Sequence, residues 1–167
     1  MKAQEAAYRF SLLVCGHPED AEDVMQDALL RTYRYVNRIA DPTAFRTWLY
    51  STVRNACLMK RRRHAGEPAH FVPLDQDVRG DDDAKTRVDV TATSRPIDQK
   101  MIDDAAGHRL REALQSLPPA YRIIVVMREI EGLSTREVSE VTGYSEANVK
   151  TRLHRARLML RRKLEGL

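Results

Sequence analysis

Apolar residues recur along this chain at steps of three and four, the spacing that places side chains on one face of an α-helix. Few stretches alternate between apolar and polar residues as half-buried β-strands do. The clearest helix is predicted to begin at Pro18, because proline followed by acidic residues suits a first helical turn. We therefore predict an all-α fold. The buried stripe of this helix would contain Ala21, Val24, Met25, Ala28, Leu29, Thr32 and Val36.

The same pattern predicts further helices on either side of a segment that lacks it. A helix over about residues 43–63 follows a turn at Asp41 and Pro42. Later helices are predicted over residues 101–116 and from the Pro118-Pro119 pair to Gly132. In between, glycines and prolines interrupt residues 65–100 and no apolar period survives. We predict two small helical domains, residues 1–64 and 101–167, joined by a flexible linker over residues 65–100.

A helix-turn-helix is predicted near the C-terminus. Ser134 and Glu137 have the spacing of a capping box, and Gly143 stands where a left-handed turn residue is needed. Ser145 can cap the second helix, whose apolar stripe begins at Val149. Away from that stripe or at its flank lie side chains that can bind base edges and phosphates, namely Asn148, Lys150, Thr151, Arg152, His154 and Arg155. From the pattern alone, a helical hairpin with a solvated charged face is the alternative.

Charge is distributed unevenly, although the net charge is only +4. Residues 1–64 carry 11 basic and 7 acidic side chains, and residues 101–167 carry 12 basic and 9 acidic ones. The predicted linker carries 5 basic and 8 acidic side chains. Basic blocks of this kind are typical of proteins that bind a polyanion, most often nucleic acid, and a solvated surface is the alternative.

Residues suited to metal or redox chemistry are sparse. Cys15 and Cys57 form no CxxC pair and suggest no disulfide framework, so we expect reduced thiols in a cytoplasmic protein. Cys15 and His17 are too few donors for a zinc site. No metal and no cofactor is predicted. The N-terminal residues contain no long apolar run, so neither a signal peptide nor a membrane span is expected.

Both helical blocks resemble the extracytoplasmic-function (ECF) sigma factors of the sigma-70 family. Residues 18–34 look like region 2.2 of that family, and residues 45–55 look like its regions 2.3 and 2.4. Residues 117–122 and 128–134 are similar to region 4.1 running into region 4.2, and residues 149–157 resemble the family's recognition helix. The matches occur in the family's order around a variable linker.

The resemblance implies a subunit that directs bacterial core RNA polymerase to promoters and initiates transcription, and that is not an enzyme. Region 2.2 of the family docks on the coiled coil of the largest polymerase subunit. Here this role would fall on Asp23, Gln26, Asp27, Leu30, Arg31 and Arg34, which mix charge and hydrogen-bonding groups around one apolar contact. A solvated helix face is the alternative.

Regions 2.3 and 2.4 of the family open the −10 element of the promoter and hold its non-template strand. The resemblance places the pocket loop at residues 41–44, including Asp41 and Thr43. It places a basic track for phosphates at Arg46, Arg54, Asn55, Lys60, Arg61, Arg62 and Arg63. Trp48 has two interpretations, because it could stack on a base or belong to the core with Phe45 and Leu49. Residues 61–63 could instead form a solvated helix end.

Region 4 of the family docks on the flap of the second-largest subunit and contacts the −35 element through its recognition helix. The predicted partners are therefore core RNA polymerase, promoter DNA and an anti-sigma factor, which in this family is often membrane-anchored. The acidic linker matches the family segment that threads toward the RNA exit path. Deletion of residues 81–83 should then alter early transcription more than promoter binding. The sequence before His17 is short for region 2.1, and the family's autoinhibitory N-terminal segment and non-conserved insertion are not found.

Two other classes of protein share parts of this pattern. A DNA-binding regulator that acts without polymerase would contain the same helix-turn-helix, but the first block shows no phospho-acceptor or ligand site. An enzyme acting on nucleic acid would need a metal site, and the carboxylates of Asp20, Glu22, Asp23 and Asp27 alternate around a helix without converging partners. No nucleophile elbow, phosphate loop or HExxH sequence occurs.

Overall fold

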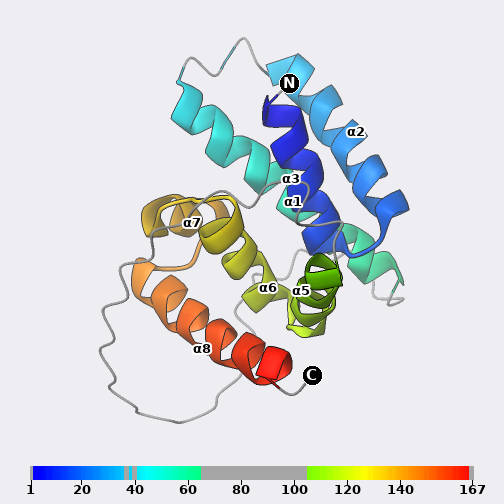
Figure 1. The fold of residues 1–167 in the computed structure, drawn as a ribbon. Coiled ribbons are helices and arrows are strands. Elements are labelled where there is room, and N and C mark those ends of the chain that lie inside the picture. The colour runs from blue at the N-terminus through cyan, green and yellow to red at the C-terminus, as the bar shows by residue number, and fades with distance from the viewer. Residues whose placement is uncertain (1, 36–37, 39–40, 65–104, 166–167) are drawn as a thin grey trace.

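Residues 2–35, 38, 41–64 and 105–165 are described by the structure, a computed structural model (Figure 1). Every long element within these ranges is a helix, which confirms the all-α prediction. The first half contains α1 (Lys2–Cys15), α2 (Pro18–Tyr35) and α3 (Pro42–His64). The second half contains α5 (Ala105–Ser116), α6 (Pro119–Val125), the π-helical turn η2 (Val126–Ile130), α7 (Thr135–Thr142) and α8 (Glu146–Glu165). The predicted linker and the first four residues of the predicted helix 101–116 lie outside the described residues.

Helix α2 begins at Pro18 as predicted, directly after the turn at Gly16. Gly16 has a φ of +87°, a conformation that residues with a Cβ rarely adopt. Of the predicted stripe, Ala21, Val24 and Ala28 are buried and Met25 and Thr32 are partly buried, while Val36 lies outside the described residues. The prediction that Leu29 belongs to the same stripe is wrong, because its side chain is 36% exposed. Leu29 lies one helical step of 100° beyond Ala28, which turns it away from α1 and α3.

The helix predicted from residue 119 to Gly132 changes its winding halfway. Residues 119–125 are α-helical, and residues 126–130 form a π-helical turn closed by the bond from Glu131 N to Val126 O, 2.9 Å. A π turn contains one more residue than an α turn, so the residues after it are rotated by about 100° relative to a continuous α-helix. This rotation helps to set the direction in which Glu131 and the helices after it leave α6.

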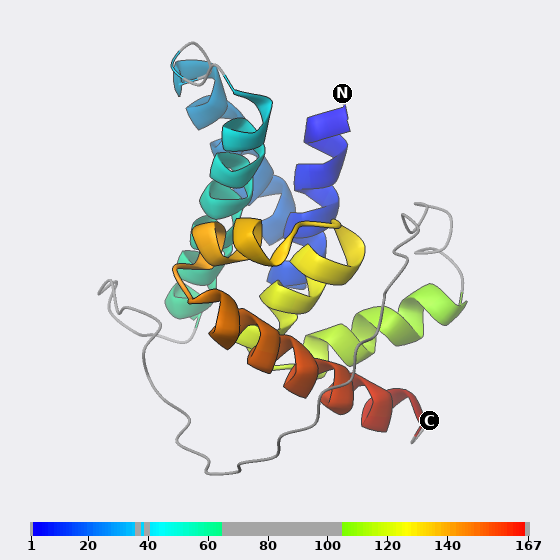
Figure 2. The ribbon, with the colours of Figure 1, turned by 90° about the vertical axis from the view of Figure 1, so that its left-hand side faces the viewer.

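The two halves of the chain lie in direct contact. Helices α1, α2 and α3 pack together, α7 crosses α3, and α5 and α6 meet the C-terminal end of α1 (Figures 1 and 2). Buried side chains of both halves belong to one apolar cluster that reaches from Ala7 in α1 to Ala156 in α8. Within it, Phe10 meets Tyr50 edge-to-face with ring centroids 5.0 Å apart. From the sequence we predicted two small domains joined by a flexible linker, and nothing in that prediction indicated that the two would be in contact.

Arg122 of α6 connects the C-terminal ends of two helices, α1 and α5, at this junction. Its guanidinium donates to the carbonyl oxygens of Leu114 (2.8 Å) and Gln115 (2.6 Å) at the end of α5, of Leu117 (3.0 Å) just after it, and of Val14 in α1 (3.1 Å). Burial, with a smaller contribution from the charge of Arg61, lowers the pKa of Arg122 to about 10, so the group is still charged at neutral pH. A buried cation is well placed here, because the last carbonyls of a helix lack partners within it.

Cys15 and Cys57 correct one of the sequence predictions. The two sulfur atoms are bonded, with the Cα atoms 5.3 Å apart, so the expectation of separate reduced thiols is wrong. Both side chains are buried at the crossing of α1 and α3. Cysteines 42 residues apart form no spacing motif, and only the packing of the two helices brings them together.

Removing this disulfide should destabilise the first half of the protein. Closing a loop of 42 residues stabilises a fold by up to about 4 kcal/mol in the chain-entropy model. We expect the chemical-denaturation midpoint, followed by circular dichroism, to fall when dithiothreitol is added. The double variant Cys15→Ala/Cys57→Ala should start at a lower midpoint and not respond to the reductant. Two reactive thiols in the unfolded, non-reduced protein would contradict the pairing.

Candidate nucleic-acid and polymerase interfaces

The outward face of α2 is the candidate docking surface. Asp23, Gln26, Asp27, Leu30, Arg31 and Arg34 are all exposed, as the resemblance required. Leu30 is 64% exposed and Tyr33 is 85% exposed, so apolar surface stands among the charges. The sequence pattern did not single out Tyr33, although it follows Leu30 by three residues and therefore lies on the same helix face. An apolar centre within a charged rim is typical of protein–protein interfaces.

Lys60 connects this docking surface to α3. Its ammonium nitrogen lies 2.5 Å from a carboxylate oxygen of Asp23 and 3.4 Å from one of Asp20. The hydrogen bond to Asp23, more than the one to Asp20, raises the pKa of Lys60. The resemblance assigns Lys60 to the DNA track and Asp23 to polymerase docking, and the structure places the two side chains against each other. Their shared ion pair positions the start of α2 on α3.

The candidate −10 pocket lies at the start of α3. Asp41 caps this helix, because its carboxylate accepts hydrogen bonds from the backbone of Thr43 (3.1 Å) and Ala44 (3.4 Å). All four residues 41–44 are exposed. Most of the preceding loop lies outside the described residues. Trp48 is half-buried against the core, with its ring 6.3 Å from those of Phe45 and Tyr35, an arrangement that favours the core interpretation.

The residues of the predicted basic track on α3 lie in two different environments, some exposed and some facing the second half of the chain. Asn55 and Arg63 are exposed, and Arg61 and Arg62 are partly exposed. Arg61 lines a cavity together with Cys15, His17 and Arg122 at the junction of the two halves. Arg46 and Arg54 instead face the second half. The structure therefore does not present the predicted residues as one continuous exposed track.

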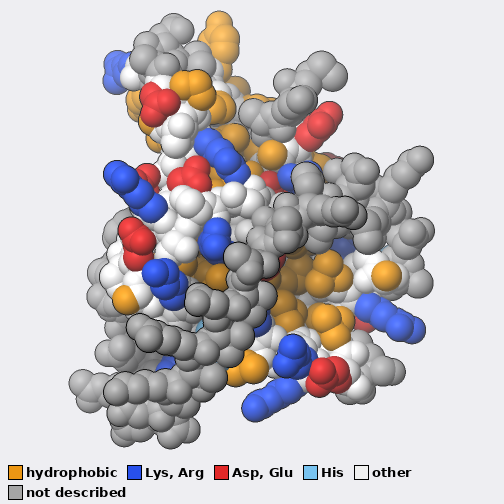
Figure 3. Space-filling model, turned by 60° about the vertical axis from the view of Figure 1, so that its left-hand side comes forward, with side chains coloured by type: hydrophobic (Ala, Val, Ile, Leu, Met, Phe, Trp, Pro, Cys, Tyr) orange, Lys and Arg blue, Asp and Glu red, His pale blue; other side chains and the backbone are white. Residues whose placement is uncertain are grey.

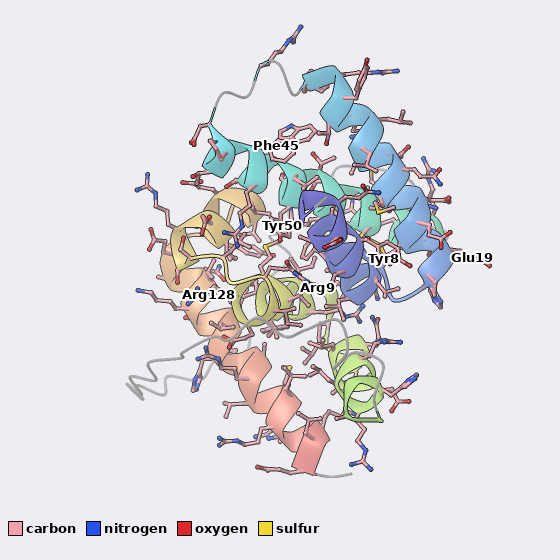
Figure 4. All side chains as sticks on the ribbon, turned by 45° about the horizontal axis from the view of Figure 1, so that its top comes forward. Tyr8, Arg9, Glu19, Phe45, Tyr50 and Arg128 are labelled. Atoms are coloured by element: carbon pink, nitrogen blue, oxygen red, sulfur yellow. A yellow bond between two sulfur atoms is a disulfide. The ribbon has the colours of Figure 1, made fainter. Side chains whose placement is uncertain are left out.

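Glu131 binds side chains of the first half that face the second half of the chain. Its carboxylate accepts two hydrogen bonds from Arg9, both 2.9 Å, and one from Tyr50, 2.6 Å. Its backbone carbonyl accepts a hydrogen bond from Arg46, 2.6 Å. The carboxylate side chain is only 1% exposed. Figure 4 shows Arg9 on α1 and Tyr50 on α3 at the side of these helices that faces the second half.

The electrostatics of this cluster agree with its geometry. The hydrogen bond and charge of Glu131 raise the pKa of Arg9 against the opposing effect of burial. Burial and the nearby Glu131 charge raise the pKa of Tyr50 far above its ordinary value, so the phenol is a hydrogen-bond donor at every physiological pH. Sequence patterns singled out neither Arg9 nor Glu131. These two residues lie 122 positions apart, and no local spacing could have indicated the pair.

The helix-turn-helix is formed by α7 and α8, and its predicted capping is confirmed. Ser134 Oγ accepts from Glu137 N at 3.1 Å, and Ser134 N donates to the Glu137 carboxylate at 2.7 Å. Gly143 ends α7 with a φ of +77°, and Ser145 Oγ accepts from Asn148 N at 3.2 Å. Val149, Leu153 and Ala156 are buried under α8. Local chemistry thus fixes both ends of the turn between the helices.

The polar face of α8 is only partly free. Lys150, Thr151 and His154 are exposed, and Arg155 is partly exposed. Arg152 Nε donates to Asn148 Oδ1 at 2.6 Å, and its guanidinium lies 4.4 Å from the ring centroid of Tyr144 and 5.8 Å from that of Tyr121. A guanidinium over an aromatic face is held by a cation–π interaction. Arg152 therefore helps to join α8 to α6 and to the turn.

Charges of both signs share the surface of the described residues. On the face drawn in Figure 3, Lys and Arg side chains are interspersed with Asp and Glu and with apolar groups. Within the described ranges, no group of three or more His, Cys, Asp or Glu could hold a metal ion. None of the helices described is both long and apolar enough to cross a bilayer.

Two family models match the chain along most of its length. Residues 2–67 match sigma-70 region 2, and residues 107–160 match sigma-70 region 4. SigM, an ECF RNA polymerase sigma factor of Mycobacterium tuberculosis, is 31% identical over 94% of this chain and 70% of its own length. This chain belongs to the ECF sigma factors of the sigma-70 family. It is accordingly a transcription initiation factor that directs core RNA polymerase to promoters.

Other similar proteins agree with this assignment. The ECF sigma factor SigE of Mycolicibacterium smegmatis is 32% identical over 94% of this chain, which spans 56% of that relative. A solved structure of the sigma factor RpoE of Bartonella quintana, in complex with the anti-sigma factor NepR, has a TM-score of 0.67 and 20% sequence identity. The similarity covers 98% of this chain and 92% of that one, and it shows that the fold is shared.

The capping box should make the stability of the helix-turn-helix depend on pH. Partial burial raises the pKa of Glu137, but its hydrogen bonds with Ser134 and the charges of Arg46 and Arg128 outweigh this effect, so the net pKa is lowered. A lowered carboxyl pKa stabilises the fold above the pKa of the unfolded chain, about 4.3, and this contribution is lost as the pH falls through the folded value.

We expect wild-type protein to lose more unfolding free energy than Glu137→Gln between pH 7 and pH 3, measured by urea denaturation. Glu140→Gln is the matched control, since the ion pair that Glu140 makes within the described residues is with the exposed Arg136 in the same helix. Parallel pH profiles for wild type and Glu137→Gln would contradict the stabilising role of this carboxylate.

Proposed function

We propose that the two halves of this sigma factor bind different parts of RNA polymerase and different promoter elements. Residues 1–64 would dock on the largest polymerase subunit and open the −10 element. Residues 101–167 would dock on the flap of the second-largest subunit and contact the −35 element. The observation that carries this proposal is the capped helix-turn-helix, whose second helix exposes Lys150, Thr151 and His154 opposite its buried face. Its combination with the exposed face of α2 favours a polymerase subunit over a stand-alone regulator.

The recognition surface would combine two kinds of contact. Asn148 and Arg155 can bond to base edges in the major groove, while Lys150, Thr151 and His154 can bind phosphates or bases. Arg152 would contribute chiefly by positioning α8, because its guanidinium already lies against Tyr144 and Tyr121. The recognition helix would enter the groove with its N-terminal part, as in other helix-turn-helix proteins.

The −10 surface would include the exposed residues Asp41, Thr43, Asn55 and Arg63. Arg46, Arg61 and Arg62, which are partly exposed, would extend it, and the buried Arg54 would join it if the second half moved away. The family resemblance assigns them to phosphates of the separated strand, whose binding requires a basic groove. Trp48 would support the pocket from the core.

The proposal also includes the location of the protein, its regulation and the role of its linker. The protein would act in the bacterial cytoplasm, where RNA polymerase is found, without catalysis of its own. An anti-sigma factor would control it, as the complex of Bartonella quintana RpoE with the anti-sigma factor NepR suggests by analogy. Residues 65–100, outside the described ranges, would thread toward the RNA exit path, which the deletion of residues 81–83 tests.

Polymerase docking should depend on the exposed face of α2. We expect Asp27→Ala/Leu30→Ala to weaken binding to core polymerase about tenfold, the effect of losing about 1.4 kcal/mol at an interface centre. Binding can be measured by fluorescence anisotropy, with transcription from the promoter of its own operon as a second measurement. Glu22→Ala is the control, since it removes a charge from the same helix on the side facing α1. Unchanged binding by the double variant would rule out this docking surface.

Promoter recognition should depend on the exposed face of α8. We expect Lys150→Ala in the holoenzyme to reduce the slope of log affinity against log salt by about 1, as loss of one phosphate contact does. Arg161→Ala, at the far end of the same helix, should leave the slope unchanged. Equal slopes for wild type and Lys150→Ala would show that this lysine does not contact the backbone of promoter DNA.

A further inference from the structure

A cavity at the junction of the two halves reaches the disulfide. Its volume is about 900 Å³, within the range of about 300–1,000 Å³ of pockets that bind small molecules. It is lined by Cys15 at the end of α1, by the start of α2, by Arg61 of α3 and by Arg122 of α6. Residues 17–19, which also line it, are exposed, so the cavity is open to solvent.

The two sulfur atoms of the disulfide differ in their access to this cavity. Cys15 lines it and is 6% exposed, whereas Cys57 is completely buried and is not among the described residues that line it. A disulfide is opened by a thiolate that attacks one of the two sulfur atoms, and the rate depends on access to that atom. An attacking group that enters through the cavity therefore meets Cys15 Sγ and leaves Cys57 as the released group.

Positive charge close to Cys15 favours an anionic attacking group. Arg122 donates to the carbonyl oxygen of Val14, the residue before Cys15, at 3.1 Å. Burial, and after it the charge of Arg61, lowers the pKa of Arg122 to about 10, so the two guanidiniums lie near each other and both are charged at neutral pH. Two like charges beside one cavity attract an anion, and the form of a thiol that attacks a disulfide is the thiolate.

Two carboxylates also line the cavity, but they are less effective at its inner end. Asp20 is paired with Lys60, whose ammonium nitrogen lies 3.4 Å from its carboxylate. Glu19 is exposed, so solvent ions screen its charge. Arg122 is only 2% exposed, and a buried charge is screened much less. The arginines therefore contribute most to the electrostatic field close to Cys15.

We propose that Cys15 is a thiol-exchange site, at which a small anionic thiol enters the cavity and opens the Cys15–Cys57 disulfide. The crossing of α1 and α3 then depends on the reduced thiols that surround the protein. This exchange concerns the free chain and is independent of the polymerase and promoter contacts assigned above.

The exchange takes place in two steps. In the first, the thiolate sulfur bonds to Cys15 Sγ, the bond between Cys15 and Cys57 breaks, and its electron pair leaves with Cys57, which takes a proton from water. In the second, another thiolate bonds to the sulfur of the first thiol, and Cys15 leaves as a thiolate. The protein disulfide gains two electrons, and two small thiols are oxidised to one small disulfide.

Single-cysteine variants test which sulfur can be reached. Cys57→Ala leaves the thiol of Cys15, Cys15→Ala leaves that of Cys57, and circular dichroism shows whether each variant keeps its helices. The probe is the dianion dithiobis(nitrobenzoate), which transfers one nitrothiobenzoate to a thiol and releases the other as a coloured thiolate. We expect Cys15 to react at least about tenfold faster than Cys57, which must wait for local opening. Equal rates, or a faster Cys57, would overturn the proposal.

The charge preference is tested on the disulfide of the wild-type protein. Its reduction is followed with 2-mercaptoethanesulfonate, 2-mercaptoethanol and cysteamine, which are anionic, neutral and cationic, and each rate is divided by the rate of the same thiol with diethyl disulfide. We expect the normalised rate to be highest for the anionic thiol. Arg61→Gln should lower the ratio of anionic to neutral rates about threefold at low ionic strength, the effect of one partly exposed charge. Arg63→Gln is the matched control, because Arg63 is exposed on the same helix and is not among the described residues that line the cavity.

The wild-type protein also carries the test of the attacked sulfur if a single-cysteine variant loses its helices. Acid quenching during the reduction, followed by peptide mass spectrometry, locates the first mixed disulfide, which should lie on Cys15 with Cys57 free. A mixed disulfide chiefly on Cys57, or equal normalised rates for the three thiols, would contradict the exchange site. A rate that rises steeply with low urea would also contradict it, since it would show that the disulfide is reached only by unfolding.

Discussion

A carboxylate that has lost its water must have charged or hydrogen-bonding partners, and Glu131 finds these partners in the other half of the chain. Arg9 from α1 and Tyr50 from α3 bind its carboxylate, and Arg46 binds its carbonyl. The relative position of the two halves depends on this contact. The π-helical turn before Glu131 contributes to it, because the turn determines where the chain leaves α6.

Other buried polar groups at the junction are also paired with hydrogen-bonding partners from a different helix. Arg122 satisfies carbonyls at the ends of α1 and α5, so it stabilises two helices and their mutual position at once. Gly16 approaches Gln115 so closely that a Cβ would lie 2.5 Å from its side-chain oxygen. Polar contacts of this kind are directional, so they select one docking geometry, whereas the apolar cluster beneath them would tolerate several.

The two functional surfaces of this sigma factor differ in how they are presented. Most side chains on the outward face of α2 and on the exposed part of α8 are accessible to a partner, although Asp23 of α2 is paired with Lys60 of α3. The arginines at the start and middle of α3 are engaged by the second half.

Local signals in the sequence were sufficient to predict the helices, the capping of α7 and the exposed polar face of α8, because these depend on residues within a few positions of each other. Pro18, the Ser134–Glu137 pair and Gly143 are such signals, and the structure confirms each. Family resemblance then supplied the function. The pairing of Cys15 with Cys57, the burial of Arg54 and the partners of Glu131 emerged only from the packed fold. These features join residues that are far apart in the chain, and the forces that unite them act only after the helices have packed.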